Sequence, residues 1–351
     1  MLPAGGLPAG GDPMSVLAGA FTASWLMRQA YPPLRYVLPG VQPEGLTIFA
    51  GSPKVGKSWA VLDTAVELAR GGHALGTLSV GAPRPVLYMA LEDGARRLQS
   101  RLHVLGVTEG PANLYFLTSV PAEHIVQTCV AFAAMHEGKG AVIYLDTLGK
   151  TAPQARSGET DYAKDYRVAS TLKQVCDDYP GTSLTAVHHT RKASAEDFLD
   201  AVSGTQGLAG AADSILVLRR GRTEEVGTLS VTSRDAMEGE YAVTFDGGRW
   251  TLPGDLRAAA EASVSVKAQD GLGERGGTVV AIVHEHPGIG PKAISERTGI
   301  PAREVSVYLG RAVEAGRIAK RTRGSYTPVG SVSSVGKEPD NPTLPTFPTA
   351  L

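Results

Sequence analysis

A glycine-rich loop is the clearest chemical signature in this sequence. Residues 51–58 read GSPKVGKS and fit the pattern G-x-x-x-x-G-K-[ST]. In such loops the backbone N–H groups and the start of the following helix attract phosphate, because their partial positive charges converge there. Lys57 would reach the β- and γ-phosphates of a nucleotide, and the Ser58 hydroxyl would ligate Mg²⁺. The loop therefore predicts a site for ATP with Mg²⁺.

Two acidic residues follow apolar runs that are typical of buried strands. Asp146 comes directly after AVIYL, and Glu92 comes directly after PVLYMAL. Because the carboxyl ends of parallel strands line the ligand crevice of an open α/β sheet, both acids can share that crevice with the loop. We expect Asp146 to hold Mg²⁺ through a water and Glu92 to orient and deprotonate the attacking water. The alternatives are a strand-ending turn for Asp146 and a first-turn helix acid for Glu92, although Asp93 fits the capping role better.

The predicted nucleotide site takes in the whole loop, the residue after it and one strand-ending acid. Its contacts are expected from Gly51, Ser52, Pro53, Lys54, Val55, Gly56, Lys57, Ser58, Trp59 and Asp146. Ser58 and, through water, Asp146 are the expected Mg²⁺ ligands. A glycine-rich turn without a nucleotide is the competing interpretation. The strand-like run before the loop and the helix-like run after it favour the nucleotide site.

Strand-like and helix-like runs alternate from the loop onwards. Strands are expected at 46–50, 85–91, 114–117, 141–145 and 183–188, with helices at 58–70, 95–104, 124–136 and 161–179. This alternation predicts an α/β fold with a mostly parallel sheet covered on both faces. Further strand-like runs at 214–219, 227–233 and 241–245 have little helix between them. They predict an antiparallel extension at one edge.

Five sequence blocks come in an order that is similar to one family. After GSPKVGKS and the strand that ends at Glu92 come YLDTLGK, VHHTRK and SGTQGLAGAADSILVLRR. Over about residues 35–250 the chain resembles the RepA-type branch of RecA-like hexameric P-loop ATPases, which is close to DnaB-type helicases and RadA. The resemblance implies a RecA-like core, a ring of subunits and Glu92 as the catalytic base. It also implies that His189, after a core strand, senses the γ-phosphate, whereas its neighbour His188 points to the opposite face.

The resemblance further implies an arginine supplied by the neighbouring subunit. Such an arginine stabilises charge on the γ-phosphate and can contribute about 10³–10⁵ in rate. Arg234, in SVTSRDAMEG, is the best match, with Arg219 and Arg220 as rivals and Arg191 as a weaker one. A solvated surface arginine is the alternative for each. DnaB-type helicases carry a substantial N-terminal domain, whereas about 34 residues precede the expected core in this sequence. The resemblance therefore implies the minimal RepA plan.

Residues 277–329 have the pattern of a small winged helix-turn-helix unit. Helices are expected at 278–286 and 291–297, and a third is opened by Pro301 at its first position and followed by two short strands. The basic residues of the third helix and the wing are Arg303, Arg311, Arg317, Lys320, Arg321 and Arg323, against Glu304 and Glu314. We expect this surface to contact DNA phosphates. A protein-binding module with a solvated basic face is the alternative.

The bulk composition excludes several classes of protein. The chain has 351 residues with 34 Lys and Arg against 35 Asp and Glu, so any nucleic-acid site must be local. Cys129 and Cys176 have no CxxC spacing, which predicts thiols in a reducing cytoplasm. The chain opens without a signal-peptide pattern and has no run of about 18 apolar residues, so no membrane span is expected.

The predicted organisation has five segments. These are an N-terminal arm at 1–34, partly disordered and with a helix over 15–30; the RecA-like ATPase core at 35–254; a linker at 255–276; the winged helix at 277–329; and a disordered tail at 330–351. Residues 255–276 are predicted to be a linker because they are rich in Ala, Ser and Gly. Residues 330–351 are predicted to be disordered because they are rich in Ser, Pro and Thr.

The favoured function is a DNA-dependent ring ATPase, a RepA-like replicative helicase or translocase of plasmid or phage type. Its expected partners are other copies in a homo-hexamer, single-stranded DNA in the ring, duplex DNA on the winged helix, and a primase or initiator. A RecA/RadA-like recombination or repair ATPase and an ATP-switched DNA-binding regulator are the alternatives. A small-molecule P-loop kinase is disfavoured because no Arg-rich lid segment follows the core.

Overall fold

The structure is a computed structural model in which the chain divides into two units. It describes residues 19–150, 158–190, 206–221, 224–269, 273–322 and 324–329. Met1–Arg35 is a short unit of its own, and the second unit begins at Tyr36. The short unit contains α1 (Ala23–Leu26), where Thr22 accepts a hydrogen bond from the Trp25 N–H. The helix expected over 15–30 is therefore much shorter, because none of its residues is buried and only local bonds support it. Residues 15–18 lie outside the described part.

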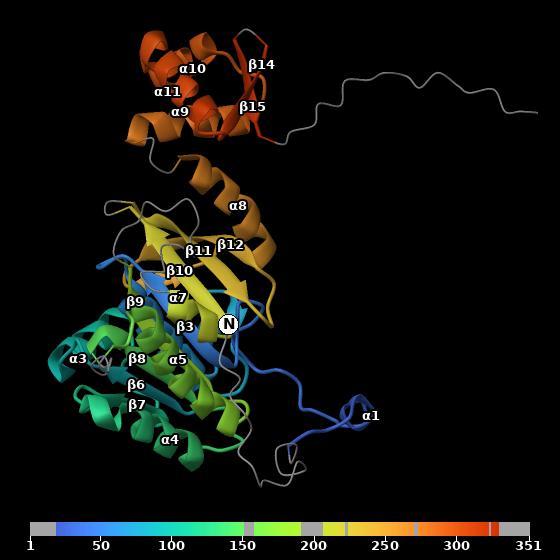
Figure 1. Ribbon diagram of the computed structural model, residues 1–351. Helices are drawn as coiled ribbons and strands as arrows, with labels where there is room; N and C mark the ends of the chain where they lie inside the picture. Colours follow the sequence, from blue (N-terminus) through green and yellow to red (C-terminus); the bar gives the residue numbers. More distant parts are fainter. Residues whose placement is uncertain are drawn as a thin grey trace, which may run out of the picture. The chain divides into compact units, whose positions relative to one another are not determined.

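A nine-stranded sheet forms the centre of the second unit, within its described residues (Figure 1). Its strands, in spatial order, are β13 (Arg249–Thr251), β12 (Gly239–Asp246), β11 (Val226–Ser233), β10 (Ser214–Arg220), β3 (Gly45–Gly51), β9 (Ser183–His189), β8 (Val142–Asp146), β6 (Val86–Ala90) and β7 (Leu114–Leu117). The strands from β10 to β7 are parallel, and β11, β12 and β13 extend the sheet in antiparallel fashion. The predicted parallel core and antiparallel edge are confirmed.

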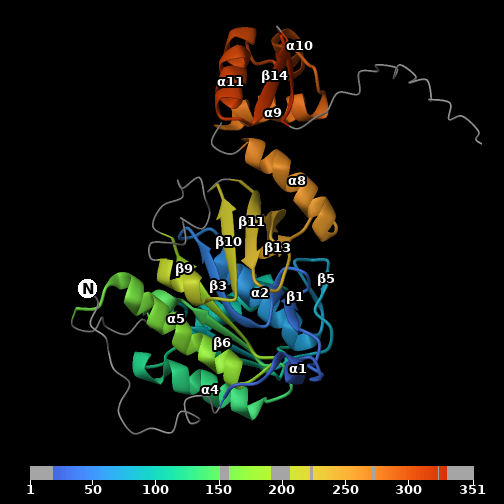
Figure 2. The same cartoon turned by 45° about the vertical axis from the view of Figure 1, so that its right-hand side comes forward.

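Helices cover both faces of this sheet. On one face lie α2 (Lys57–Arg70), α3 (Ala95–Val104) and α8 (Leu256–Gln269); on the other lie α4 (Ile125–Met135), α5 (Asp161–Asp178) and α7 (Gln206–Ala211). Figure 2 shows α4 and α5 side by side. All five residues of β6 and of β8 are buried, which fits their apolar sequences; Asp146, which ends β8, is the exception. No described helix is long and apolar enough to cross a bilayer.

The sequence does not predict several elements of the structure. They are α7, the edge strand β13, the one-turn helices η2 (Ala122–His124) and η3 (Leu148–Lys150), and the short pairs β1 (Tyr36–Leu38) with β2 (Gln42–Pro43) and β4 (His73–Ala74) with β5 (Leu78–Ser79). The linker prediction also needs correction. Residues 256–269 form α8, which packs on β12 and buries Ala259 completely. Its alanine-rich sequence favours a helix, and the apolar side of that helix extends the core beyond residue 254.

The C-terminal elements follow the predicted order. They are α9 (Gly273–Glu285), α10 (Pro291–Thr298), α11 (Ala302–Glu314), β14 (Ile318–Thr322) and β15 (Ser325–Pro328). Their buried side chains, among them Val283, Ile294 and Leu309, form a separate apolar cluster. Pro301 is the residue before α11 and not its first residue, which corrects its predicted position by one. Arg323 and residues 330–351 lie outside the described part.

Two buried carboxylates tie α2 to the antiparallel edge of the sheet. Asp63 and Glu67 are 5% and 2% exposed, and Nη1 of Arg249 on β13 lies 3.5 Å and 3.7 Å from them. The Arg249 guanidinium also donates to the carbonyl of Leu105, and Glu67 pairs with Arg70. Burial raises the pKa of the Asp63 carboxyl from 3.8 to about 6, although Arg249 opposes this shift. The interaction therefore joins α2, β13 and the end of α3 through one cation.

The raised pKa of Asp63 predicts that stability depends on pH in a defined window. Between about pH 4 and pH 6 the folded chain holds a proton on Asp63 that the unfolded chain releases, so the free energy of unfolding should fall as pH rises. The expected loss is on the order of 2–3 kcal/mol. Asp63→Asn cannot titrate at this position, so its free energy of unfolding should rise relative to that of the wild type as pH increases from about 4 to about 6. Above that window the difference between the two free energies should stay constant.

Urea denaturation followed by circular dichroism, compared between the two proteins at each pH, measures this difference directly. Arg249→Gln removes a cation that lowers the pKa of Asp63 in the folded chain, so the upper end of the window should rise in that variant while its lower end stays near pH 4. A difference between wild type and Asp63→Asn that stays constant from pH 4 to pH 6 would contradict the prediction.

Candidate nucleotide-binding site

The glycine-rich loop joins the end of β3 to the start of α2. Gly51 pairs with Leu218 on one neighbouring strand and with His189 on the other, so the loop lies at the carboxyl edge of the parallel strands. Lys54 and Gly56 have φ values of 66° and 109°, which curl the backbone. Gly56 caps α2 without a side-chain hydrogen bond. The first N–H groups of α2 therefore remain available for phosphate oxygens, as the sequence predicts.

Lys57 is buried at the base of this loop. Its side chain is 3% exposed, and its Nζ lies 2.6 Å from the Gly51 carbonyl oxygen and 2.9 Å from that of Ser52. A third contact joins Nζ to Nδ1 of His189 at 3.1 Å. Burial lowers the pKa of the Lys57 ammonium to about 8, and the nearby acids Asp146 and Glu92 oppose this shift. The site is thus built to hold a desolvated cation where phosphate charge would arrive.

Asp146 lies at the end of β8, next to the loop. It is 3% exposed, and the Tyr88 hydroxyl donates to its Oδ2 at 2.7 Å. Burial raises the pKa of its carboxyl, and hydrogen bonds from Ser58 and Tyr88 oppose the shift. Oδ1 is buried and has no partner at good hydrogen-bond geometry among the described groups. A carboxylate oxygen with unused lone pairs beside a hydroxyl is the donor set that suits a hydrated Mg²⁺.

Glu92 and His189 come together at the same edge. Their side chains are 39% and 38% exposed, and Nε2 of His189 lies 3.7 Å from Oε2 of Glu92. Since Lys57 can only donate to Nδ1, the neutral ring carries its proton on Nε2, towards Glu92. The three side chains therefore form a line that runs from the loop lysine through the imidazole to the predicted base.

Neither Glu92 nor Asp93, the two acids before α3, caps this helix. Gly94 is the N-cap of α3, and no side chain caps this helix. Glu92 therefore does not cap it. Asp93 does not cap it either, which corrects the sequence interpretation: Asp93 accepts hydrogen bonds from Arg97, at 2.8 Å, and from Arg101. Asp93 is 7% exposed and anchors α3, which leaves Glu92 as the accessible acid at the strand end.

Two tryptophans lie against the loop and its helix. The ring of Trp59 packs on Gly248, and the Arg101 guanidinium lies 5.1 Å from its centroid. A contact between Trp59 and the nucleotide stays a prediction. Trp250, which the sequence analysis missed, donates from Nε1 to the Gly56 carbonyl at 3.1 Å. Nothing in its local sequence marks this role, because β13 lies far from the loop in the chain.

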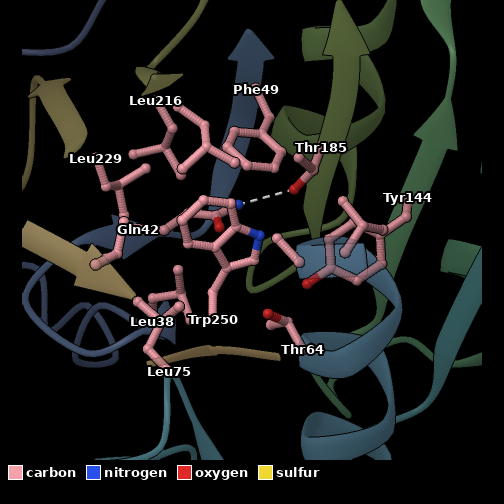
Figure 3. Close-up of a pocket in the computed structure, with 14 residues that line it drawn as sticks. Leu38, Gln42, Phe49, Thr64, Leu75, Tyr144, Thr185, Leu216, Leu229 and Trp250 are labelled. Carbon is pink, nitrogen blue, oxygen red and sulfur yellow. Dashed lines mark hydrogen bonds between the residues drawn. The ribbon is translucent and has the colours of Figure 1, made fainter. Parts of the chain in front are cut away.

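A small cavity lies in the core beneath the loop helix. Trp250 points into it, and Gln42 closes part of its wall with a hydrogen bond to Thr185 at 2.8 Å (Figure 3). Its volume is about 40 Å³, so it is too small for a nucleotide. The candidate site is instead the open edge formed by the loop, Asp146 and Glu92.

The candidate arginines lie at opposite ends of the central strands. The backbone N–H of Arg234 donates to the Asp213 carbonyl, and the Asp213 N–H donates to that of Leu46 at the start of β3. Arg234 is therefore the length of β3, roughly 16 Å, from the loop of its own chain. Arg219 and Arg220 lie at the loop end, where Arg220 stacks 4.5 Å from the Phe245 centroid. Arg191 lies outside the described residues.

The hydrogen bond from Tyr88 to Asp146 predicts a change in metal dependence. Tyr88→Phe removes a donor that orients the carboxylate, and losses of this kind typically cost about 10–100-fold in metal affinity or activity. We expect the Mg²⁺ concentration for half-maximal ATP hydrolysis to rise about tenfold. Tyr144→Phe is a matched control, because Tyr144 is also buried in the sheet but its hydroxyl has no partner among the described residues. An equal Mg²⁺ requirement in the two variants would argue against this role for Tyr88.

Two solved structures are similar to this chain in fold. One is the ATPase domain of G40P, with 14% sequence identity and a TM-score of 0.48, and the match covers 60% of this chain and 84% of that one. The other is a DnaB-like replicative helicase, described with its interactions with primase. It has 14% identity and a TM-score of 0.47, and the match covers 59% of this chain and 57% of that one. This chain thus spans little more than half the length of that helicase.

No curated protein matches the sequence at a significant level. The profile of the AAA domain family matches residues 14–195, which is more than half of the 351 residues. The matched range contains the loop, Glu92, Asp146 and His189, the residues that meet at the carboxyl edge of the sheet. Together with the glycine-rich loop between β3 and α2, this match establishes that the chain belongs to the AAA domain family and is a P-loop ATPase.

Proposed function

We propose that this chain is a DNA-dependent ring ATPase that acts as a replicative helicase or translocase of the RepA type, from a plasmid or phage. The observation that carries the proposal is the line from Lys57 through His189 to Glu92 at the carboxyl edge of the sheet. A polar side chain that touches both the loop lysine and the base can link γ-phosphate occupancy to the reactivity of the base. The blocks resembling RepA-type ATPases favour DNA as the regulator of this site.

In the proposed reaction each residue has one task. The loop N–H groups and Lys57 bind the β- and γ-phosphates. Ser58 and, through water, Asp146 would hold Mg²⁺, which would supply positive charge to neutralise the phosphate oxygens. Glu92 accepts the proton of the attacking water. His189 faces Glu92 with Nε2 at 3.7 Å, beyond hydrogen-bond distance, and leaves Lys57 when a γ-phosphate arrives.

The proposed assembly is a homo-hexamer in which Arg234 completes a neighbouring site. Arg234 is too far from its own loop. Its side chain is 59% exposed, although it donates a hydrogen bond to the Gly210 carbonyl and lies 3.9 Å from Oδ1 of Asp213. It therefore suits a role across a subunit boundary better than a role within its own chain. In this proposal single-stranded DNA passes through the ring, duplex DNA binds the C-terminal winged helix, and a primase or initiator is the protein partner.

Two other functions remain as alternatives. A recombination or repair ATPase of the RecA/RadA type would use the same residues but would assemble as filaments on DNA. An ATP-switched DNA-binding regulator is favoured by one specific observation, the basic C-terminal unit, and would show little turnover. Turnover with and without DNA separates the regulator from the ring ATPase, and electron microscopy of the assembled protein, which distinguishes rings from filaments, separates the RecA/RadA type.

The first experiment measures ATP hydrolysis with and without single-stranded DNA. We expect DNA to stimulate the wild type, and we expect Lys57→Ala and Glu92→Gln each to lose about 10²–10⁴-fold in turnover. Glu92→Gln should still bind a fluorescent ATP analogue, since the base does not hold the phosphates, whereas Lys57→Ala should not. Full turnover in Glu92→Gln would exclude Glu92 as the base. Turnover indifferent to DNA, with specific duplex binding, would favour the regulator.

The second experiment tests the arginine across the subunit boundary by complementation. Arg234→Ala and Lys57→Ala should each be nearly inactive alone. In a mixed assembly, the intact loop of an Arg234→Ala subunit can lie beside the intact arginine of a Lys57→Ala subunit. Hydrolysis should therefore reappear and reach a maximum when the two variants are mixed in near equal proportions. The control is a mixture of Lys57→Ala with the double variant, which contains no intact boundary. Absence of recovery in mixtures that electron microscopy shows to be assembled would remove Arg234 from the site.

A further inference from the structure

An exposed glycine lies in the middle of α11, where none of the residues that the structure describes requires it. Gly310 is the ninth residue of this thirteen-residue helix. A Cβ placed on it would meet no atom within 4 Å among the described residues. Glycine is unfavourable in a helix interior compared with alanine, because it loses more backbone freedom on folding. Since packing against the described residues does not require the glycine, the missing side chain points to a partner that approaches the helix closely.

The face around Gly310 is open and basic. Buried Val305 and Leu309 lie on the opposite side of α11. Arg303 and Arg311 share the exposed side with Gly310, and neither has an ion-pair partner among the described residues. The exposed acid of this side is Glu314, at the last turn of the helix.

Charge is concentrated in this part of the chain. Residues 273–329 carry nine Lys and Arg against five Asp and Glu, although the whole chain has a net charge of −1. Glu304, on the first turn of α11, is paired with Arg275 at 3.1 Å, which reduces its opposition to an anionic partner. Lys320 adds an exposed cation on β14. A polyanion is therefore the partner that this surface fits.

The connection before α11 holds the helix at a fixed angle. Gly299 ends α10 with a φ of 70°. The Thr298 hydroxyl donates to the Ile294 carbonyl and accepts from the Ile300 N–H, and the Ser295 hydroxyl donates to the Ile300 carbonyl at 2.6 Å. A turn secured by three side-chain bonds presents a rigid helix, which suits docking into a groove of fixed width.

We propose that α11 enters the major groove of duplex DNA, with Gly310 at the closest approach to the bases and Arg303, Arg311 and Lys320 on the flanking phosphates. The major groove admits a helix about 10–12 Å across, and a position without a side chain brings the helix axis nearer to the base edges. This inference rests on the proposed duplex partner and assigns its contact residues. It is separate from hydrolysis, since the residues of the nucleotide site lie in other elements.

The test measures duplex binding and thermal stability in the same full-length variants, without nucleotide. Fluorescence anisotropy with a labelled mixed-sequence duplex gives affinity over a range of salt concentrations. Arg303→Gln combined with Arg311→Gln should weaken binding about tenfold or more and reduce the salt slope by about two phosphate contacts. The control Arg257→Gln removes an exposed, ion-paired arginine from α8 and should leave affinity and slope unchanged.

Gly310→Ala and Gly310→Gln give a signature that a structural role would not produce. Both should keep or raise the melting temperature, because alanine and glutamine favour a helix more than glycine does. Duplex affinity should fall in graded fashion, more for glutamine than for alanine. A lower melting temperature in Gly310→Ala would reveal an internal role for the glycine and overturn the inference.

Three other results would also overturn it: wild-type protein that does not bind duplex, Gly310→Gln that binds like wild type, or arginine variants with an unchanged salt slope. ATP hydrolysis stimulated by single-stranded DNA should be retained in every α11 variant. Loss of that stimulation together with duplex binding would place this surface in the DNA site of the ring and reject a separate duplex site. If duplex DNA does not bind but single-stranded DNA still stimulates ATP hydrolysis, the inference about α11 is wrong and the proposed DNA-dependent ATPase is unaffected.

Discussion

The structure depends on the burial of one cation, Lys57, at the carboxyl edge of the parallel sheet. Removing an ammonium group from water is costly unless several acceptors surround it. Here the carbonyls of Gly51 and Ser52 and the ring of His189 accept hydrogen bonds from it, while Asp146 and Glu92 supply negative charge. These groups come from the ends of four strand-linked segments, so the register of β3, β6, β8 and β9 must be correct for the cation to be tolerated.

The antiparallel edge of the sheet braces the helix that carries this cation. Trp250 donates a hydrogen bond to the Gly56 carbonyl at the start of α2, and Arg249 forms ion pairs with Asp63 and Glu67 further along that helix. The last short strand therefore fixes both the position and the rotation of α2. Loss of Arg249 would leave the charges of both acids uncompensated in the core.

The distribution of charge separates the two chemical surfaces of the protein. The nucleotide site combines one desolvated lysine with acids, whereas the C-terminal elements are basic within a chain of almost zero net charge. A globally neutral chain limits nonspecific attraction to nucleic acid, so any contact with DNA depends on local surfaces and their shape. Gly310 illustrates this dependence, because its contribution would come from the close approach it permits and not from charge.

The sequence by itself determined the glycine-rich loop, the alternation of strands and helices, and the positions of Asp146 and Glu92 at strand ends. These follow from local patterns, since a loop motif and a buried strand are each encoded within a few neighbouring residues. Only the tertiary structure decided that His189 contacts Lys57, that Asp93 pairs with arginines of α3, that residues 256–269 join the core, and that Trp250 supports the loop. The Trp250 hydrogen bond joins residues 194 positions apart. Such contacts arise from the register of the whole sheet, and no local run of sequence specifies which distant side chains the folded sheet will bring together.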